Sequence, residues 1–247
     1  MSFTEEERQR YARHILLKEI GGPGQQRLKA ATVAIAGAGG LGAPAALYLA
    51  AAGVGRLVLI DDDSVSLDNL QRQIIFRNAD VGAAKVDRAK AALVALNDNI
   101  AIEIERQRLT ESNAAYLLQG ADVALDGTDD FDTRFAINAA TRSLGIPLVS
   151  GAIGRWEGQV STFARGGPCY RCFVPEAPPD AETCARVGVV GALTGVIGSI
   201  MALEAIKLIT LAGEPLIGRV MLFDGLNGNA RTVALSPDPA CPVCANE

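Results

Sequence analysis

The sequence predicts an α/β protein built on a doubly wound, mostly parallel sheet, with an antiparallel C-terminal extension and a four-cysteine metal site. Three observations predict this class. Short apolar segments alternate with helical patterns in the first half of the 247 residues. A glycine-rich motif follows the first of these segments, and two Cys-X-X-Cys pairs occur in the second half.

The apolar segments of the first half are short, and most are bounded by Gly, Asp or Asn, as is typical of strands. They cover residues 32–36, 57–60, 101–104, 122–125 and 147–150. Helical patterns lie between them, at residues 41–52, 85–96, 112–119 and 132–144. Uninterrupted apolar strands that alternate with helices indicate a parallel sheet covered on both faces. Such a sheet binds its ligands beyond the carboxyl ends of its strands.

The second half differs, because it contains three strand patterns with only one long helical pattern among them. The strands are expected at residues 159–164, 220–223 and 231–235, which favours an antiparallel extension of the sheet. We interpret the uncharged residues 187–203 as a buried helix; a membrane span is the less favoured alternative, because the stretch is short for one. Residues 177–181 are Pro-rich and predict a mobile crossover loop.

Composition narrows the class of protein. Hydrophobic residues make up 49% and charged residues 21%, as in a globular chain. The formal net charge of −5 disfavours nucleic acid as the main partner. Residues 1–10 are polar and lack the apolar core of a signal peptide, so a cytoplasmic location without a membrane partner is expected. Residues 5–17 predict an amphipathic helix outside the sheet.

Gly37, Gly39 and Gly42 form a G-X-G-X-X-G motif, with Gly40 inside it, between the first strand and the first helix of the sheet region. Glycines in this pattern allow a tight turn and a close approach of the backbone to phosphate. The N-terminus of the following helix offers free N–H groups to an anion. The motif therefore predicts a phosphate-binding turn.

Acidic residues follow the second strand about twenty residues later, where a ribose contact is expected. Asp61 and Asp63 are the candidates, within an acidic run at residues 61–63. With strand, helix and acid in place, the pattern predicts a Rossmann-like site for a mononucleotide or dinucleotide. The alternative is a tight packing turn that binds no ligand.

The nucleotide is better explained as a triphosphate than as a dinucleotide. No P-loop motif is present, and the only histidine, His14, lies in the N-terminal helix, so hydride transfer lacks an obvious proton donor. Two cations and three amides follow the second strand: Arg72 and Lys85, with Asn69, Gln71 and Gln73. Cations beside an anion-binding turn suit a triphosphate. The alternative for Arg72 and Lys85 is that of solvated surface charges.

Three carboxylates follow the fourth strand, again at the edge where ligands bind. They are Asp126, Asp129 and Asp130. A carboxylate that faces phosphates is best explained by Mg²⁺, which binds one or two carboxylates together with phosphate oxygens. Spacing alone leaves the choice among the three open. Any of them could instead cap the helix that begins near residue 131.

Four cysteines fall in two pairs that match the spacing of a structural zinc site. They are Cys169 with Cys172, and Cys241 with Cys244. Four thiolates form a closed tetrahedral set with no open position, so the predicted zinc is structural. Disulfides are the alternative, and a reducing compartment disfavours them.

A fifth cysteine, Cys184, lies outside both pairs and close to Arg186 in the sequence. A nearby arginine lowers a thiol pKa and favours the reactive thiolate. Free cysteines are also among the most buried residues. Chemistry alone leaves the reactive and the buried interpretation open.

The chain resembles the MoeB/ThiF/HesA adenylyltransferases, bacterial relatives of ubiquitin-activating enzymes, from about residue 11 to residue 244. The resemblance rests on motifs that occur in the same order. They are Arg13 within Tyr-Ala-Arg-His, the glycine motif, residues 61–63, residues 69–73, Lys85, residues 128–129, both cysteine pairs and the helical residues 198–208. Two positions depart from the family pattern: Asp130, where Asn is usual, and His14, where Gln is common.

The resemblance implies roles for individual residues. ATP is expected to contact Gly40, Asp61, Asn69, Arg72, Lys85 and Asp129, with Mg²⁺ on Asp129. The other candidate contacts to the nucleotide are Gly37, Gly39, Gly42, Asp63, Gln73 and Asp130. Because the family forms homodimers, Arg13 is expected to reach the phosphates of the neighbouring subunit. Cys184 aligns with the acceptor cysteine of the family. The catalytic candidates are Asp129, Arg72, Lys85, Arg13 and Cys184.

The implied activity is ATP-dependent adenylation of the C-terminal Gly-Gly carboxylate of a ubiquitin-like sulfur-carrier protein, for thiamin or molybdopterin synthesis. The sulfur donor is expected to be a separate cysteine desulfurase or rhodanese, because no rhodanese domain follows Cys244. The alternatives are an NAD-dependent oxidoreductase, a zinc-stapled binding module without turnover, and a family member that modifies tRNA.

The expected organisation is a single domain over residues 1–247. An N-terminal helical segment (1–28) precedes a nucleotide-binding half (29–151). A carrier-binding half with the zinc site (152–247) completes the chain.

Overall fold

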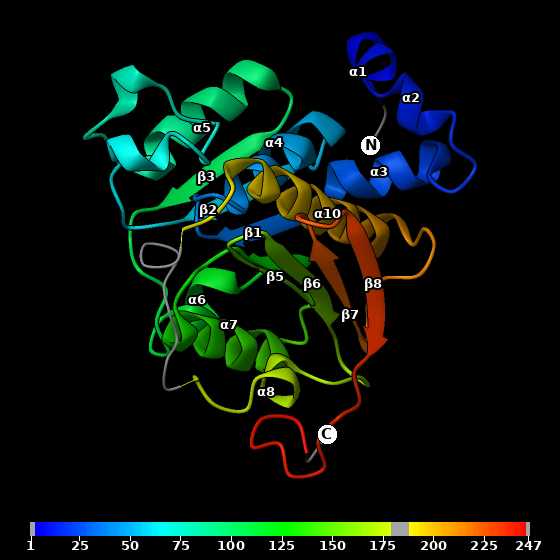
Figure 1. The fold of residues 1–247 in the computed structure, drawn as a ribbon. Coiled ribbons are helices and arrows are strands. Elements are labelled where there is room, and N and C mark those ends of the chain that lie inside the picture. Colours follow the sequence, from blue (N-terminus) through cyan, green and yellow to red (C-terminus); the bar gives the residue numbers. More distant parts are fainter. Residues whose placement is uncertain (1–2, 179–187, 246–247) are drawn as a thin grey trace.

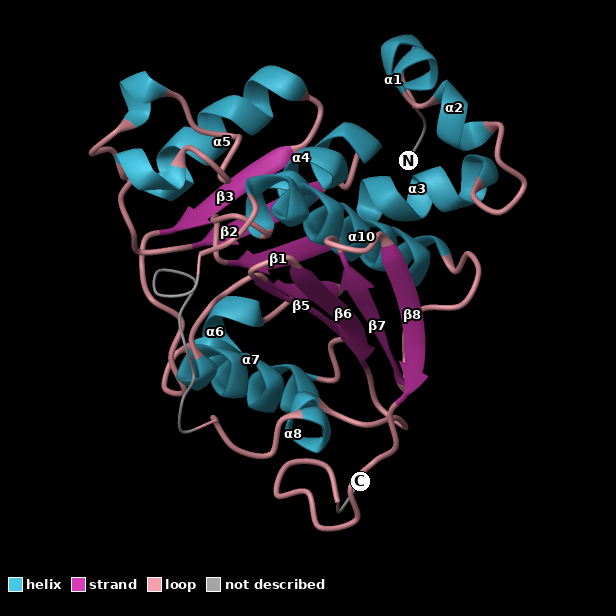
Figure 2. Ribbon diagram, in the orientation of Figure 1, coloured by secondary structure: helices cyan, strands magenta, loops and turns pink. Residues whose placement is uncertain are grey.

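The computed structural model describes residues 3–178 and 188–245, and in them one sheet lies between two layers of helices (Figure 1). The helices on one side are α3 (Gly21–Ala30), α4 (Gly42–Ala52), α5 (Lys85–Leu96) and α10 (Gly191–Thr210). Those on the other side are α6 (Ala114–Leu118), α7 (Phe131–Leu144) and α8 (Tyr170–Phe173), as Figure 2 shows. This three-layer arrangement is the α/β class that the sequence predicts.

The sheet has the order β3-β2-β1-β4-β5-β6-β7-β8. The first five strands are β1 (Thr32–Ala36), β2 (Arg56–Ile60), β3 (Ala101–Glu105), β4 (Val123–Asp126) and β5 (Leu148–Gly154), and they pair in parallel. The last three are β6 (Glu157–Phe163), β7 (Arg219–Asp224) and β8 (Asn229–Ala234), and they continue the sheet antiparallel from β5. The predicted doubly wound sheet with an antiparallel extension is confirmed.

The strand order reverses between β1 and β4, and this switch point positions the site. From β1 the chain moves outward through β2 to β3, and it then returns to place β4 on the other side of β1. The loops that leave β1 and β4 therefore diverge, and they open a crevice at the carboxyl edge of the sheet. The glycine motif follows β1, and the residues after Asp126 follow β4, so both lie at this crevice.

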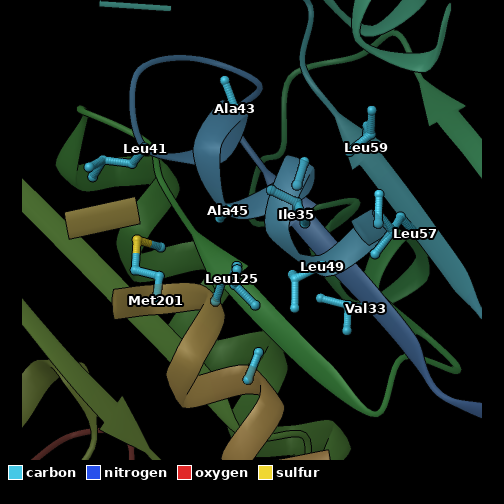
Figure 3. Packing of buried hydrophobic residues seen from close by; sticks show 14 of the residues in the cluster. Val33, Ile35, Leu41, Ala43, Ala45, Leu49, Leu57, Leu59, Leu125 and Met201 are labelled. Carbon is cyan, nitrogen blue, oxygen red and sulfur yellow. The ribbon is translucent and has the colours of Figure 1, made fainter. Parts of the chain in front are cut away.

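Each central strand buries side chains on both faces, which explains its uninterrupted apolar sequence. In β1, Val33 and Ile35 join the core beneath α4 and α10, where Leu57, Leu125 and Met201 also pack (Figure 3). The intervening alanines, 34 and 36, belong to the second core beneath α6 and α7. Alternate residues of a strand point to opposite faces, so a strand covered on both sides must be apolar throughout.

Helix α10 confirms the interpretation of the apolar C-terminal stretch as a buried helix. Among the described residues it is the one helix long and apolar enough to cross a membrane, yet 50% of its most apolar window is buried within the fold. It packs against α3, α4 and the strands β5 and β6. The start of the predicted segment, at residue 187, and the Pro-rich residues 179–181 lie outside the described residues.

The N-terminal segment is not the single helix that the pattern predicts over residues 5–17. Helix α1 (Glu5–Arg10) ends at Tyr11, and the short α2 (Ala12–Ile15) follows. The side chain of Tyr11 is buried against Gly53, and its hydroxyl accepts a hydrogen bond from Asn97 at 2.9 Å. Anchoring Tyr11 in the fold interrupts the helix, an effect of tertiary structure that local periodicity does not carry.

Helix α3 forms over residues 21–30 although it begins Gly-Gly-Pro-Gly, and the sequence pattern did not predict its bounds. Pro23 falls in the first turn, where a backbone N–H has no partner within the helix, so proline is tolerated there. The buried side chains of Gln25 and Leu28 hold α3 to the fold. Gln25 donates to the carbonyl of Ala52 at 2.8 Å and so joins α3 to the end of α4.

Two glycines of α10 provide a matched test of this packing. A Cβ atom at Gly198 would lie 2.5 Å from the backbone oxygen of Leu41, whereas one at Gly195 would meet nothing within 4 Å. Gly198→Ala is expected to lower the free energy of unfolding by about 2 kcal/mol or more, through overpacking. Gly195→Ala is expected to raise it by about 0.5–1 kcal/mol, through helix propensity. Urea unfolding measures both, and a Gly198→Ala variant as stable as the parent would contradict the packing described here.

Candidate functional site

A cavity of about 830 Å³ lies at the carboxyl edge of β1, β2 and β4. Its volume falls within the usual range for a small-molecule site. Eleven predicted nucleotide contacts line it: Gly37, Gly39, Gly40, Asp61, Asp63, Asn69, Arg72, Gln73, Lys85, Asp129 and Asp130. Residues predicted from four separate segments of the sequence are thus brought together around one space.

The glycine loop has the left-handed backbone geometry that phosphate-binding turns use. Gly37 has a φ of 86°, which residues other than glycine rarely adopt. Gly42, the twelfth predicted contact, does not line the cavity. A Cβ atom there would overlap the carbonyl oxygen of Gly37, so its part is to let α4 pack against the loop.

The carboxylate of Asp61 joins this loop to the end of β2. Its Oδ2 accepts a hydrogen bond from the N–H of Ala38 at 2.7 Å, and its Oδ1 accepts one from the N–H of Asp63 at 2.8 Å. Burial raises the pKa of Asp61, against the opposing effect of the Lys85 charge and of these two N–H donors. Asp61 therefore fixes the loop in addition to facing the cavity.

Lys85 and Arg72 approach the cavity from the segment after β2. Lys85 is the first residue of α5 and is buried, with its Nζ 2.7 Å from Oδ2 of Asp63. Arg72 is half-buried and donates through Nη1 to the carbonyl oxygen of Asp68 at 3.1 Å. The interpretation of Lys85 as a solvated surface charge is wrong, because only 6% of the residue is exposed.

Two buried amides lie next to these cations. Asn69 is in the short 3-10 helix η1 (Leu67–Asn69), and Gln73 lies just beyond it. The Oε1 atom of Gln73 is buried without a hydrogen-bond partner in the described part of the chain. A buried polar atom that lacks a protein partner at a cavity wall is suited to a ligand or a bound water.

The three carboxylates after β4 have different surroundings. Asp126 is buried and accepts hydrogen bonds from the N–H and hydroxyl of Thr128 and from the hydroxyl of Ser150, at 3.0, 2.7 and 3.1 Å. Asp130 caps α7 by accepting from the N–H of Thr133 at 2.9 Å, and it pairs with an arginine. Asp129 is exposed to the cavity, and within residues 3–178 and 188–245 its carboxylate accepts no hydrogen bond.

Two arginines of the cavity wall were missed by the sequence reasoning. Arg108 follows β3 and lies 3.2 Å from Oδ2 of Asp130. Burial alone would raise the pKa of Asp130, but the N–H of Thr133 and the Arg108 charge hold this pKa below its usual value. Arg134, in the first turn of α7, is buried beneath the Thr128 carbonyl. Arg108 could have been found, since it follows a parallel strand at the ligand-binding edge.

Arg13, a predicted catalytic residue, and His14, the only histidine, both lie away from the cavity. Arg13 is exposed on α2, which Figure 1 shows well apart from the arrowhead of β3 and the loops at the carboxyl edge. His14 is half-buried, and its Nδ1 lies 3.2 Å from Oε1 of Gln25, so it is held in the fold and is not available to the cavity. Cys184 lies outside the described residues.

The four paired cysteines form one cluster between α8 and the C-terminal segment. Their sulfur atoms lie within 4.8 Å of one another. The separations are 3.5 Å for Cys169 and Cys241, 3.4 Å for Cys172 and Cys244, and 4.0 Å for Cys169 and Cys172. A tetrahedral zinc with Zn–S bonds of 2.3 Å requires sulfur atoms about 3.8 Å apart. The donor set therefore fits zinc, whereas a disulfide requires about 2 Å.

Neighbouring groups do not act alike on these thiols: burial raises the pKa of Cys169 and of Cys244, whereas the pKa of Cys241 is lowered. The backbone N–H of Asp238 donates to Cys172 Sγ at 3.4 Å. Burial alone raises the pKa of Cys241, but N–H groups of Val243 and Cys244 together with the other thiols lower it to about 7. Hydrogen bonds to thiolate sulfur are the usual outer contacts of a structural metal site.

Comparison with known proteins gives one consistent result. The family model described as "ThiF family" matches residues 11–243. The SAMP-activating enzyme E1 of Haloferax volcanii is 46% identical over 237 residues, which cover 95% of this chain and 88% of that protein. The sulfur carrier protein adenylyltransferase of Thermus thermophilus is 43% identical, with 100% and 94% covered. The adenylyltransferase and sulfurtransferase MOCS3 of Anopheles gambiae is 48% identical, and the match covers 96% of this chain but 54% of MOCS3.

Solved structures share the fold. PaaA superposes with a TM-score of 0.82 at 26% identity, over 96% of this chain and 76% of PaaA. E. coli MccB with MccA-N7isoASN superposes with a TM-score of 0.86 at 22% identity, over 97% of this chain and 75% of MccB. The likeness covers both the parallel half of the sheet and its antiparallel extension.

Zinc content tests the cysteine cluster. The purified protein is expected to hold about one zinc ion per chain, and Cys172→Ser to lose it. Loss of the metal is expected to lower the free energy of unfolding by about 4 kcal/mol or more, because metal removal is among the largest single-site effects.

Cys184→Ser is the matched control, since it removes a cysteine outside the cluster and is expected to retain the metal. Thiol titration of the unfolded, chelated protein completes the test. Fewer reactive thiols than the 5 cysteines of the sequence would favour the disulfide alternative.

Proposed function

Because the chain belongs to the ThiF family, we propose that it is an ATP-dependent adenylyltransferase that activates the C-terminal carboxylate of a small ubiquitin-like sulfur-carrier protein. One observation carries the proposal: the glycine loop, two cations and a free carboxylate surround a single cavity. Relatives named as sulfur-carrier and SAMP-activating enzymes match nearly the whole chain at more than 40% identity.

The reaction requires no side-chain nucleophile. A carboxylate oxygen of the carrier attacks the α-phosphorus of ATP, and the bond from that phosphorus to the bridging oxygen breaks. The leaving pyrophosphate takes the electron pair, and the acyl-adenylate remains on the carrier. Negative charge builds on the transferred and leaving phosphates, so preorganised cations are the main catalytic requirement. Within the described residues the cavity wall contains no histidine, which agrees with this chemistry.

Lys85 and Arg72 are suited to neutralise that charge. Both face the cavity, and the burial of Lys85 strengthens its interaction with a phosphate because little solvent screens it. In the structure Lys85 pairs with Asp63, and a triphosphate would offer it a more highly charged partner. Arg108 adds a third cation to the wall of the cavity.

Asp129 fits the requirement for Mg²⁺. Magnesium binds one or two carboxylates and takes its remaining ligands from water and phosphate. Asp126 and Asp130 are engaged by hydrogen bonds and an ion pair, whereas the Asp129 carboxylate is open to the cavity. Bound with the nucleotide, Mg²⁺ would supply charge neutralisation at the phosphates. The cysteine cluster would hold a structural zinc, separate from this chemistry.

The carrier tail has a route to the nucleotide along the extended sheet. A second cavity of about 690 Å³ lies on β5 to β8 and shares Ala152, Ile153 and Gln159 with the first. Its floor includes Gly154, where an added Cβ atom would meet nothing within 4 Å, so this position leaves room for an extended peptide. We therefore assign residues 29–151 to nucleotide binding and residues 152–247 to carrier binding, after an N-terminal helical segment (1–28).

A homodimer would account for Arg13. Its exposed position on α2 leaves the guanidinium free to reach a neighbouring molecule. Sulfur is expected from a separate cysteine desulfurase or rhodanese, and Cys184 is the candidate acceptor for the later sulfur-transfer step. The pathway served would be that of thiamin or molybdopterin.

ATP–pyrophosphate exchange with a panel of Gly-Gly-terminated carriers tests the function. Exchange is expected with one carrier and is expected to vanish when its last glycine is deleted, because the attacking carboxylate is then misplaced. Folded, zinc-loaded protein that exchanges with no carrier would favour an oxidoreductase or a binding module without turnover. Exchange driven by a tRNA base carboxylate would favour the tRNA-modifying alternative.

Asp129→Ala separates adenylation from sulfur transfer. It is expected to reduce exchange at least about 100-fold, as loss of a preorganised electrostatic contact does. Asp132→Ala is the control, because this carboxylate is exposed on α7 outside the cavity. Cys184→Ala is expected to exchange normally, and loss of exchange in a folded Cys184→Ala protein would contradict the division of roles.

Mixing two inactive variants tests whether Arg13 acts across a dimer. Arg13→Ala and Asp129→Ala are each expected to be inactive alone. Reassociated in equal amounts, they are expected to recover about a quarter of parental exchange, because half of the dimers are mixed and each has one intact site. If no activity returns although mixed dimers form, Arg13 acts within its own subunit.

A further inference from the structure

Buried hydrogen bonds run without a break from the cysteine cluster to the loop that carries Asp129. We propose that Tyr170 and Arg134 are positioning residues that hold the Asp129 carboxylate in place for Mg²⁺-ATP. This inference rests on the proposed function, because it assigns a task at the same nucleotide cavity. It connects the cysteine cluster to the nucleotide cavity through the hydrogen bonds of Asn138, Tyr170 and Arg134.

The connection begins at Asn138, a fully buried residue of α7. Its Nδ2 donates to Cys169 Sγ at 3.6 Å, and its Oδ1 accepts a hydrogen bond from the backbone N–H of Tyr170 at 2.8 Å. One side chain therefore holds both a cysteine of the cluster and the residue next to it. Water does not reach this amide, so the protein alone sets its geometry.

The ring of Tyr170 is fixed by aromatic neighbours. The residue is 2% exposed, and its ring centroid lies 5.8 Å from that of Phe163, 5.9 Å from Phe135 and 6.5 Å from Phe173. Edge-on and tilted packing of this kind restricts a ring to one orientation. The phenol oxygen is thereby directed at Arg134, whose Nη1 donates to it at 3.3 Å.

Arg134 transmits this position to the loop after β4. Its Nε and Nη2 both donate to the carbonyl oxygen of Thr128, at 3.2 and 2.6 Å. The guanidinium is planar and its donors are fixed relative to one another, so holding Nη1 on the phenol sets the direction of the other two. Arg134 is 8% exposed, and solvent therefore offers little competition for these donors.

Thr128 is also held from its other side. Its N–H and its hydroxyl both donate to Oδ1 of Asp126. The next residue but one, Asp130, caps α7 through Thr133. The backbone on either side of Asp129 is thus fixed, while the Asp129 carboxylate projects into the cavity without a hydrogen bond from any described residue. This is the geometry expected of a preorganised magnesium ligand.

The phenol oxygen of Tyr170 also limits where the charged guanidinium of Arg134 can turn. Asp126 and Asp129 are the carboxylates that act on the Arg134 guanidinium. Without the phenol, one donor of Arg134 is left unsatisfied, and the guanidinium can turn toward either carboxylate. A turn toward Asp129 would pair the charge that Mg²⁺ requires. Tyr170 therefore keeps Arg134 on the Thr128 carbonyl and leaves Asp129 free.

Tyr170→Phe tests the inference, since it removes one oxygen and keeps the ring. Titration calorimetry of ATP without any carrier, at several Mg²⁺ concentrations, is the readout. Apparent affinity for Mg²⁺-ATP is expected to fall about threefold to tenfold, as expected for loss of a hydrogen bond from a charged donor. Affinity for ATP in excess EDTA and the zinc content are expected to match the parent. Tyr116→Phe is the matched control, because Tyr116 is 75% exposed on α6.

A double-mutant cycle decides whether Tyr170 acts through Asp129. In an Asp129→Asn background, Tyr170→Phe is expected to change Mg²⁺-ATP affinity less than twofold, because the group it positions is gone. An effect that persists undiminished there would overturn the proposal. So would a folded, zinc-loaded Tyr170→Phe protein with parental Mg²⁺-ATP affinity.

Arg134→Lys serves where the phenylalanine variant fails to fold. Lysine keeps the positive charge but lacks the planar, fixed set of N–H donors of the guanidinium. The substitution is expected to weaken Mg²⁺-ATP binding in the same Asp129-dependent way. These binding measurements need no carrier and no turnover. They can therefore support the positioning role even if every carrier fails, whereas a parent that does not bind ATP would overturn both this inference and the proposed function.

Discussion

The close approach of backbone segments at the start of α4 is the constraint on which the rest of the structure depends. Gly42 lies against the carbonyl of Gly37, Gly127 lies against the N–H of Gly42, and Gly198 of α10 lies against the carbonyl of Leu41. A Cβ atom would overlap the backbone at Gly42 and Gly198, and at Gly127 it would fit only if a neighbour shifted. Together these contacts bring the glycine loop, the end of β4 and the core helix α10 into close packing at the switch point. The phosphate-binding face of the loop then faces the cavity.

This close backbone packing determines which charged side chains lie around the cavity. The cavity wall carries carboxylates from the ends of β2 and β4 and cations from the segments after β2 and β3 and from α7, and two of these cations form ion pairs with the carboxylates. Lys85 pairs with Asp63, and Arg108 pairs with Asp130. A cation already held near its working position requires little reorganisation when a phosphate arrives. Asp130, which stands where the resembled family usually has Asn, adds a charge that Arg108 and the N-terminus of α7 offset.

Much of the fold could be predicted because strand burial and glycine chemistry are local signals. The run of residues 33–36 is apolar throughout, as a strand covered on both faces requires, and the glycine motif that follows it then fixes the carboxyl edge. The cysteine pairs were predictable because their spacing matches a metal's geometry. The break at Tyr11 was not predictable, since it depends on Gly53 and Asn97, which lie far away in the sequence. Arg134 was missed for the same reason: on α7 it looks like an ordinary charged helix residue until Thr128 and Tyr170 surround it.

The antiparallel extension explains why the cysteine cluster stands where it does. Cys169 follows β6 and Cys241 follows β8, so the two cysteines bracket the strands β7 and β8 and lie 72 residues apart. Closing so long a loop in the unfolded chain costs entropy, and a metal that closes it stabilises the fold relative to that chain. The outer strand β8 is exposed along its length and buries little apolar surface of its own. The cysteine cluster beyond its end therefore adds a second attachment to the pairing of β8 with β7, and it helps to hold the outer half of the sheet, with the second cavity, in place.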